Sequence, residues 1–349
     1  MLLLTSGFQA SGASSLTKVT VAVATAQFAT SVSPYSSIPK FLGYWQEEGL
    51  DVTVLGVAGS AIAMPMILSG QVDFAFPGTP WYLAVVAENP DVVAYYCLYP
   101  HNQFRIAVRE NSPFLGLRDL KGAKVGVPDL ASAAVVYGKA ALRSVGLDPE
   151  RDVEFLPVGN QAVQIAYALL RNQIEAFIGF DNNVGGLEAL GVRIRLLSTE
   201  FDKRLGCGLV IATKRSTLAN QRRVAVGVAR GIAKGTLFAL TNPEAAVRIH
   251  WRVYPETKPV VAAESEALRR GVMELKARLE TMRIDNTPKK LWGYVSEDTF
   301  QYYQRFLYTY QQIKRIVPFR EAFDDSLIPE INNWDKASIA KQAREYKGP

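Results

Sequence analysis

Residues that commonly build metal centres are scarce in this chain. It has two cysteines, Cys97 and Cys207, and two histidines, His101 and His250, and no C-x-x-C pair. Structural and catalytic zinc sites use clusters of such residues at short spacings. We therefore expect no metal and no cofactor. The two cysteines could form a disulfide in an oxidising compartment or stay as buried free thiols, and the sequence leaves both open.

The chain also lacks a block of like charges. Its 39 Lys and Arg residues face 33 Asp and Glu residues, which gives a net charge of +6 spread along the sequence. Arms that bind nucleic acid concentrate their positive charge in one run. A mild and dispersed excess is typical of a solvated surface, so we expect no nucleic-acid partner.

A phosphate-binding loop is missing as well. The stretch "LRDLKGAKVGVPDLAS" (117–132) contains a lysine and two glycines, but the Gly-Lys-Ser/Thr that a P-loop requires does not follow. The first residues, "MLLLTSGFQASGASS", have a short apolar part and no basic region before it. We interpret residues 1–17 as the remnant of a longer export signal or as a disordered segment.

What the chain does contain is an alternation of apolar strands and helices. "KVTVAVATAQ", "LDVTVLGV", "VDFAFPG" and "VVAYYCLY" read as buried strands, with helices expected in "SSIPKFLGYWQEEG" and "SAIAMPMILSGQ" between them. This order predicts parallel pairing with helical crossovers. The pattern restarts at "FRIAVRE" and continues to residue 198, which indicates a second α/β unit.

The length of 349 residues exceeds the size at which a single core keeps growing. After the strand "GCGLVIATK" the chain becomes helical, and this last part has too few strands to form a further sheet. We therefore expect two lobes. Lobe I is discontinuous and comprises 18–108 and 207–349, and lobe II comprises 109–206, with a hinge near Arg109 and Gly206.

Five segments resemble a known family, and they occur in the family's order. They are "IPKFLGYWQEEGLDVTV" (38–54), "ILSGQVDFAF" (67–76), "FRIAVRENSPFLGLRDLKGAKVGVP" (104–128), "LRNQIEAFIGF" (170–180) and "NPEAA" (242–246). The family is that of the periplasmic solute-binding proteins of ABC importers, of the nitrate/sulfonate/taurine and thiamine-pyrimidine-precursor type. The resemblance implies a two-lobed type II binding-protein fold, with mixed sheets flanked by helices and a helical C-terminal part.

In open α/β sheets the ligand lies beyond the carboxyl ends of the strands, so residues that follow a strand are the candidates for the site. The predicted ligand-binding residues are Gln27, Phe28, Ser33, Gly59, Ser60, Gly78, Thr79, Trp81, Asp129, Ser132, Asn160, Phe180, Asp181, Asn182 and Asn183.

Several of these residues have a structural alternative. Ser60 and Thr79 could cap helices instead of binding a ligand. Trp81, Phe28 and Phe180 could stack on a flat solute or could belong to the core. The small residues Ala131 and Ser132, where a helix is expected to begin, would let a ligand oxygen approach the helix N-terminus.

The sequence "FDNNVGG" is the most informative of these places. Asp181, Asn182 and Asn183 would bring a carboxylate and two amides to the cleft, unless they form a turn or a helix cap. A bare anion would meet an uncompensated carboxylate there unless Arg105, Arg109 or a helix N-terminus balanced it. We therefore expect a small polar organic solute, aromatic or heterocyclic, although a sulfonate stays open.

Three functions remain open. The resemblance implies an exported, periplasmic receptor, here expected as a monomer, that closes on a solute and delivers it to a membrane ABC permease. An enzyme on the same fold, similar to the thiamine-pyrimidine synthase or to menaquinone-pathway proteins, is the alternative. No catalytic residues stand out, because the family's pyrimidine synthase uses a histidine set that two histidines cannot supply. A ligand sensor is the third possibility.

Overall fold

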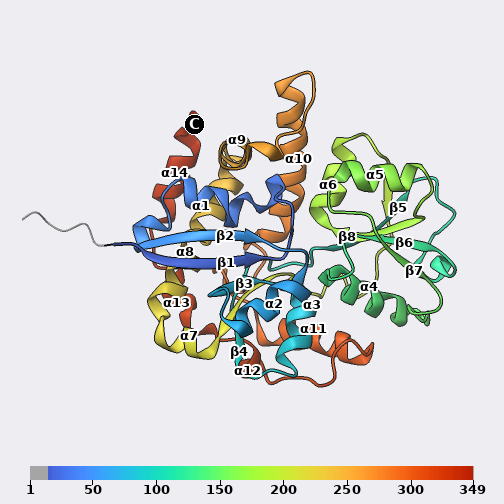
Figure 1. Ribbon diagram of the computed structural model, residues 1–349, viewed down its shortest axis with the longest axis horizontal. Coiled ribbons are helices and arrows are strands. Elements are labelled where there is room, and N and C mark those ends of the chain that lie inside the picture. The colour runs from blue at the N-terminus through green and yellow to red at the C-terminus, as the bar shows by residue number, and fades with distance from the viewer. Residues whose placement is uncertain (1–14, 349) are drawn as a thin grey trace, which may run out of the picture.

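A computed structural model describes residues 15–348 of the chain. Most of the N-terminal segment interpreted as an export-signal remnant lies outside these residues. The described chain forms two bodies side by side, each built on one sheet (Figure 1). The predicted two-lobed α/β fold is thereby confirmed.

The first sheet has the strand order β2-β1-β3-β10-β4. Its members are β1 (Thr17–Val23), β2 (Leu50–Gly56), β3 (Phe74–Phe76), β4 (Val92–Cys97) and β10 (Val210–Lys214). Strand β1 pairs in parallel with β2 and β3, while β10 is antiparallel to both β3 and β4. All six residues of β4 are buried, as expected for a strand with helices on both faces.

The second sheet repeats this plan with the order β7-β6-β8-β5-β9. Its members are β5 (Phe104–Arg109), β6 (Lys124–Val127), β7 (Glu154–Pro157), β8 (Ala176–Phe180) and β9 (Ile194–Leu196). Strand β6 is parallel to β7 and β8, and β5 is antiparallel to β8 and β9. In each sheet the fourth strand in the order, β10 or β5, is antiparallel to its neighbours. Each of these two strands follows a segment in which the chain crosses from one lobe to the other. We call these two segments the passages.

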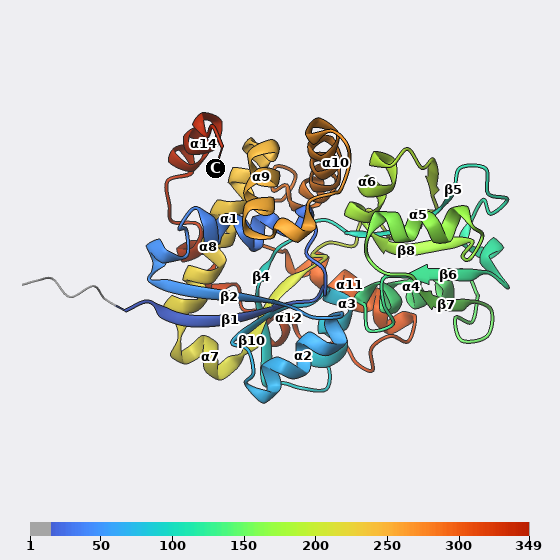
Figure 2. The same cartoon turned by 45° about the horizontal axis from the view of Figure 1, so that its top comes forward.

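Helices cover both faces of the sheets (Figures 1 and 2). The helices are α1 (Ser37–Phe41), α2 (Ser60–Ser69), α3 (Thr79–Val86), α4 (Ala133–Ser144), α5 (Ala162–Leu170), α6 (Asp181–Ala189), α7 (Arg215–Asn220), α8 (Arg222–Thr241), α9 (Pro243–Val253), α10 (Glu264–Met282), α11 (Glu297–Thr309), α12 (Phe319–Ala322), α13 (Ile328–Ile331) and α14 (Lys336–Glu345). Short 3-10 helices supplement them at Thr30–Tyr35, Gln46–Glu48, Leu117–Leu120, Pro255–Thr257 and Asp325–Leu327.

The helix expected in "SSIPKFLGYWQEEG" is broken. Helix α1 ends at Phe41, and a separate 3-10 turn covers Gln46–Glu48. Gly43 interrupts the helix with a φ of 77°, a left-handed conformation that favours glycine. Trp45 then packs in the core, where its Nε1 donates to the carbonyl oxygen of Val228.

Helix α8 is long and apolar enough to cross a membrane, yet 72% of its most apolar stretch is buried inside the protein. It packs against η1 (Thr30–Tyr35) and α14. Gly231 lets the side chain of Trp45 pack against α8, because a Cβ at this position would lie 2.5 Å from the indole nitrogen of Trp45. The hydrophobicity of α8 is that of a core helix.

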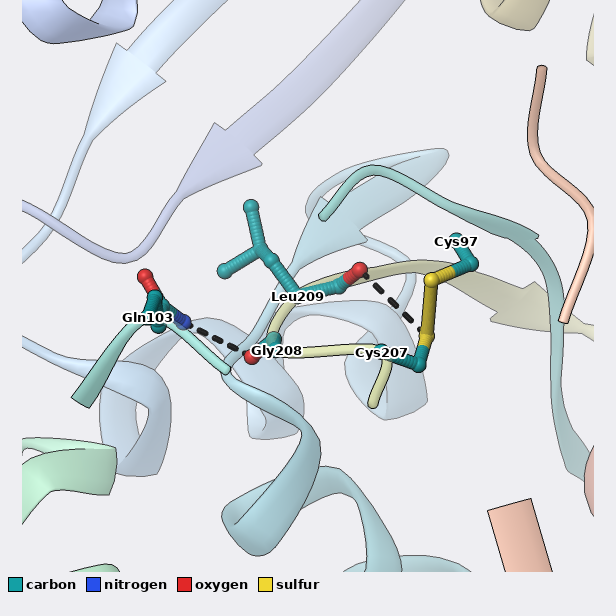
Figure 3. The surroundings of a disulfide bond; sticks show 5 residues. All are labelled: Cys97, Gln103, Cys207, Gly208 and Leu209. Carbon is teal, nitrogen blue, oxygen red and sulfur yellow. Dashed lines mark hydrogen bonds between the residues drawn. A yellow bond between two sulfur atoms is a disulfide. The ribbon is translucent and has the colours of Figure 1, made fainter. Parts of the chain in front are cut away.

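The two passages between the lobes lie side by side and are joined covalently. Leu98 donates a backbone hydrogen bond to Leu209, and Gly208 donates one to Tyr99. A disulfide links Cys97, at the end of β4, to Cys207, so the alternative of free thiols is excluded (Figure 3). The Nε2 of Gln103 donates to the carbonyl oxygen of Gly208 at 2.7 Å, which adds a further hydrogen bond between the two passages.

Helix α10 lies beside α6 along most of its length and so connects the C-terminal helices to the second lobe (Figures 1 and 2). The approach is close because Gly185 has no side chain. A Cβ at that position would lie 2.6 Å from the Cβ of Ala277. The residues on this face of α10 reach the cleft between the lobes.

Candidate functional site

A small polar cavity lies between the lobes, where the strands of both sheets end. Its walls are formed by Val23, Ala24, Thr25, Gln27, Ala29, Ser31, Val32, Tyr35, Ser60, Phe76, Gly78, Tyr99, Gln103, Ser132, Ala133, Asn160, Phe180, Asn182, Leu209 and Arg278. We call this the inner cavity. Its volume is about 50 Å³, which is room for one or two water molecules.

The lobes touch each other around the inner cavity. The backbone N–H of Ala61 donates to the carbonyl oxygen of Ala131 across the cleft at 3.2 Å. The side-chain amide of Asn160 donates to Thr25 Oγ1 at 3.3 Å. A Cβ on Gly59 would lie 2.5 Å from the same carbonyl oxygen of Ala131. The structure therefore has its lobes closed.

Arg278 of α10 is the one cationic side chain among the residues that line the inner cavity. Its side chain is 5% exposed. Nη1 donates to Gln103 Oε1 at 2.6 Å, and Nη2 donates to Asn182 Oδ1 at 2.5 Å. The guanidinium carbon lies 4.4 Å from the ring centroid of Tyr99, a favourable cation–π distance. Its Nε has no hydrogen-bond partner among the described residues.

Asp181 compensates this buried cation. Its Oδ1 lies 2.8 Å from Nη2 of Arg278, and Thr281 Oγ1 donates to its Oδ2 at 2.7 Å. Burial raises the pKa of Asp181, and the neighbouring charges of Arg278 and Arg105 oppose that effect. Asp181 is thus occupied by protein partners, and it is not among the residues that line the inner cavity.

The two asparagines after Asp181 differ in what they do. Asn182 lines the inner cavity and accepts from Arg278. Asn183 instead accepts a hydrogen bond from the backbone N–H of Phe180 at 2.8 Å, at the start of α6. Its amide nitrogen donates to the side-chain oxygen of Asn160 at 3.0 Å, which orients that residue at the cavity wall.

Aromatic rings line the same cavity. Phe180 lies at the end of β8, and its ring centroid is 5.7 Å from that of Phe104. Tyr99 donates from its hydroxyl to the hydroxyl of Tyr35 at 2.8 Å, and burial raises the pKa of both phenols. These rings provide flat surfaces and a neutral hydroxyl group beside the guanidinium of Arg278.

Two predicted serines lie at helix starts on opposite sides of the cavity. Ser132 is the N-cap of α4, and its Oγ accepts from the backbone N–H of Ala134 at 3.2 Å. Ser60 accepts from the backbone N–H of Gly78 at 3.0 Å, so its hydroxyl orients the neighbouring loop and does not cap α2. Both serines still line the cavity.

Other predicted residues lie outside the inner cavity. Strand β3 ends at Phe76 and helix α3 begins at Thr79, so Trp81 lies within the helix and not at the end of the strand. Its side chain packs against apolar core residues. Ser33 and Thr79 are buried, and their hydroxyl oxygens have no partner among residues 15–348. Asp129 lies against the loop at Gly59, and burial raises its pKa.

A second and larger cavity of about 660 Å³ adjoins the first. We call it the outer cavity. It is lined by Ala26, Gln27, Phe28, Ala29, Thr30, Gly56, Gln161, Ala162, Val163, Gly186, Ala189, Leu190, Tyr254, Glu256, Thr257, Lys258, Pro259, Arg270, Gly271 and Glu274. Gln27 and Ala29 line both cavities. The predicted residue Phe28 lies here. Its ring meets the ring of Tyr254 in an edge-to-face arrangement, with the two ring centroids 4.9 Å apart.

The residues that the sequence analysis missed come mainly from α10. Glu274, Arg278 and Thr281 lie three or four residues apart and therefore share one face of the helix. The strand-end rule cannot find them, because α10 belongs to neither sheet. The available signal was a set of polar residues at helical spacing, and sequence alone does not reveal which helix faces the cleft.

Two lobes joined by two adjacent passages, with a polar cavity between them, define a protein of the type II solute-binding class. The comparison with family models agrees, and it matches residues 38–246 to the family described as NMT1/THI5 like. The chain belongs to this NMT1/THI5-like family. The family predicted from the five segments is thereby confirmed. A search of curated protein sequences found no significant match.

Solved structures share this fold. The alkanesulfonate-binding protein SsuA of Xanthomonas axonopodis pv. citri, bound to MOPS, is 14% identical, with a TM-score of 0.64 over 88% of this chain and 98% of that one. The periplasmic nitrate-binding protein NrtA of Synechocystis PCC 6803 is 14% identical, with a TM-score of 0.61 over 95% and 89%. The desulfurization enzyme DSZB is also 14% identical, with a TM-score of 0.56 over 90% and 99%.

Proposed function

We propose that this protein is an extracytoplasmic receptor that closes its lobes on a small polar organic solute and delivers it to a membrane ABC permease. The observation that carries the proposal is the inner cavity, where the buried guanidinium of Arg278 faces groups from both lobes. Buried polar side chains of this kind are costly unless they are used or paired. Asp181, Asn182 and Gln103 pair with this guanidinium, and we infer that a solute binds beside the group that they hold in place.

We propose a hinge at the two passages near residues 98–103 and 205–209. Strand β5 begins at Phe104 and pairs within the second sheet, so the first passage lies before the boundary at residue 109 that the sequence suggested. Hinges of two-lobed proteins are a few residues that absorb the change of backbone angle. The disulfide between Cys97 and Cys207 lies at one end of these passages.

An aromatic or heterocyclic solute fits the cavity wall best. Phe180, Tyr99 and Tyr35 provide ring surfaces and a hydroxyl group, while Gln103 and Asn182 provide amides. Amides both donate and accept, which suits the polar edge of a ring. A second acidic group on the solute would gain little binding energy from Arg278, because Asp181 already neutralises most of the charge of the guanidinium group.

A compartment outside the cytoplasm is part of the proposal. A disulfide between buried cysteines persists in oxidising surroundings such as the bacterial periplasm and is rare in the cytosol. Within the described residues, no group of three or more His, Cys, Asp or Glu side chains could hold a metal ion.

A thermal-shift screen tests this proposal. The panel contains nitrate, short alkanesulfonates, taurine, aromatic acids, aromatic amides and pyrimidines. A solute at a hundred times its dissociation constant stabilises the folded protein by about 2.7 kcal/mol, which is readily measured. We expect ring compounds to stabilise the protein most. Stabilisation by nitrate or taurine and by no ring compound would contradict the proposed solute class. If no compound of the panel stabilised the protein, the result would contradict the receptor function.

Delivery to a permease needs a separate measurement. Cells that express the protein together with a candidate ABC permease and its ATPase should take up the stabilising solute faster than cells that lack the protein. Equal uptake in both strains, with tight binding to the purified protein, would point to a sensor instead of an importer component.

A further inference from the structure

The inner cavity is too small to hold a solute by itself. Its volume is about 50 Å³, whereas sites for small organic ligands usually measure about 300–1,000 Å³. The adjoining outer cavity provides about 660 Å³, and Gln27 and Ala29 form a wall common to both. A solute in the closed protein therefore extends from the inner cavity into the outer one, past the residues at their junction.

Glu274 lies at that junction. Its Oε1 accepts from the side-chain amide of Asn182 at 3.3 Å, and its Oε2 accepts from Thr30 Oγ1 at 3.2 Å. Asn182 lines the inner cavity, whereas Thr30 and Glu274 line the outer one. A carboxylate offers about four acceptor positions, so it can accept further hydrogen bonds from a solute.

No cation of the described residues pairs with Glu274. Arg278, four residues further along the same helix, pairs with Asp181, and its charge also acts on Glu274 in the direction that lowers the pKa. Arg270 and Lys258, which also line the outer cavity, pair with Glu266 and Glu264 at 2.7 and 2.9 Å. The carboxyl group of Glu274 therefore has no ion-pair partner among the described residues. Burial raises the pKa of Glu274 to about 7, and the hydrogen bonds from Asn182 and Thr30 and the charge of Arg278 oppose this effect only in part.

Arg278 provides the opposite kind of group, one helical turn away. Its Nε is buried without a hydrogen-bond acceptor among residues 15–348, and the side chain lines the inner cavity. Side chains four residues apart on a helix have Cβ atoms about 5–6 Å from each other. Helix α10 thus places a buried guanidinium at the inner end of the site and a carboxyl group at the junction.

We propose that Glu274 determines specificity in this cleft by selecting solutes that carry an N–H donor, best a protonated amine, within several ångströms of the acceptor group bound near Arg278. This inference rests on the proposed receptor function. It distinguishes amine- or amide-bearing solutes from plain anions of the same shape. A plain anion leaves the carboxylate of Glu274 facing an apolar or anionic group, and an unpaired buried charge is costly.

Two probes of equal size test the proposal. 3-(Aminomethyl)benzoate has a carboxylate and a protonated amine on one ring, whereas 3-ethylbenzoate replaces the amine with a methyl group. Binding is measured by calorimetry at about pH 8, where Glu274 is ionised. The variants are Glu274→Gln and, as a control on the same helix, Glu280→Gln, whose side chain is 71% exposed.

We expect the wild-type protein to bind the amine probe at least about tenfold more tightly than the ethyl probe. Glu274→Gln should reduce that preference to about twofold or less, and Glu280→Gln should keep it. A wild-type preference for 3-ethylbenzoate, or an unchanged preference in Glu274→Gln, overturns the inference while the receptor function stands. Binding of neither probe also overturns it, and the wider thermal-shift panel then decides separately whether the receptor function fails too.

Discussion

Arg278 Nη2 lies 2.8 Å from Asp181 Oδ1, and this buried ion pair joins α10 to the start of α6. Thr281 donates to the other oxygen of Asp181, and Gln103 accepts from Nη1 of Arg278. The ion pair therefore connects a C-terminal helix, a passage between the lobes and the second lobe. It also sets the orientation of the guanidinium in the inner cavity.

Replacing Arg278 with alanine should strongly destabilise the protein. The substitution leaves the carboxylate of Asp181 buried without its cation, a change that typically costs about 3–5 kcal/mol. Urea denaturation measures the free energy of unfolding. Adding Asp181→Asn to Arg278→Ala should recover part of the loss, because the buried charge is then gone.

Arg283→Ala is the control for this prediction, since the Arg283 side chain is 46% exposed and pairs with Asp285 at the surface. It should cost less than about 1 kcal/mol. Equal losses for Arg278→Ala and Arg283→Ala would show that the buried ion pair has no special role.

The stability of the protein should depend on pH through Glu274. Its pKa is raised from 4.5 to about 7 in the folded state, so the unfolded protein loses this proton at lower pH than the folded one. The contribution of Glu274 to stability is therefore most favourable below about pH 4.5 and is lost as the pH rises through about 7. A pKa shift of this size corresponds to a change of roughly 3 kcal/mol in the free energy of unfolding.

Comparing the wild-type protein with Glu274→Gln isolates this effect, because all other titrating groups are shared. The wild type should lose stability relative to Glu274→Gln between about pH 4.5 and 7, as followed by urea denaturation at several pH values. A difference that stays constant over this range would mean that Glu274 keeps an ordinary pKa.

Removing the disulfide should destabilise the protein without changing its fold. Cys97 and Cys207 are 110 residues apart, and the loop that they close contains the whole second sheet. Cross-links over long loops typically contribute about 2–4 kcal/mol by restricting the unfolded chain. Cys97→Ala with Cys207→Ala should lower the melting temperature, and a reductant should lower that of the wild type alone. A melting temperature unaffected by reductant would contradict the prediction.

Closure of the lobes can be tested without a solute through Gly78. Its backbone φ of −61° suits any residue, but a Cβ there would collide with the Cβ of Ala133 on the opposite lobe. Gly78→Val should therefore hold the lobes apart and increase the radius of gyration in small-angle scattering. The control is Gly116→Val, where a Cβ would meet no atom within 4 Å. Equal radii for Gly78→Val and the wild type would argue against the closed arrangement.

Local sequence patterns were sufficient to predict the fold class, and they led to several residues of the candidate site. The strand of "KVTVAVATAQ" and the helix of "ASAAVVYGKAALRSVG" follow from their apolar periodicity and length, and both form near the expected positions. Gln27, Ser60, Gly78, Ser132, Asn160, Phe180 and Asn182 line the inner cavity because strand ends converge there. A rule about strand ends needs no knowledge of how the helices pack.

Only the tertiary structure decided the rest. Asp181 faces Arg278 and does not line the inner cavity, Trp81 packs against the core, and Glu274 lines the outer cavity. These facts depend on the packing of α10 against α6, which lie about 90 residues apart in the chain and meet through the small residues Gly185 and Ala277. Periodicity identifies the polar face of a helix, but it cannot tell whether that face meets water, another lobe or a solute.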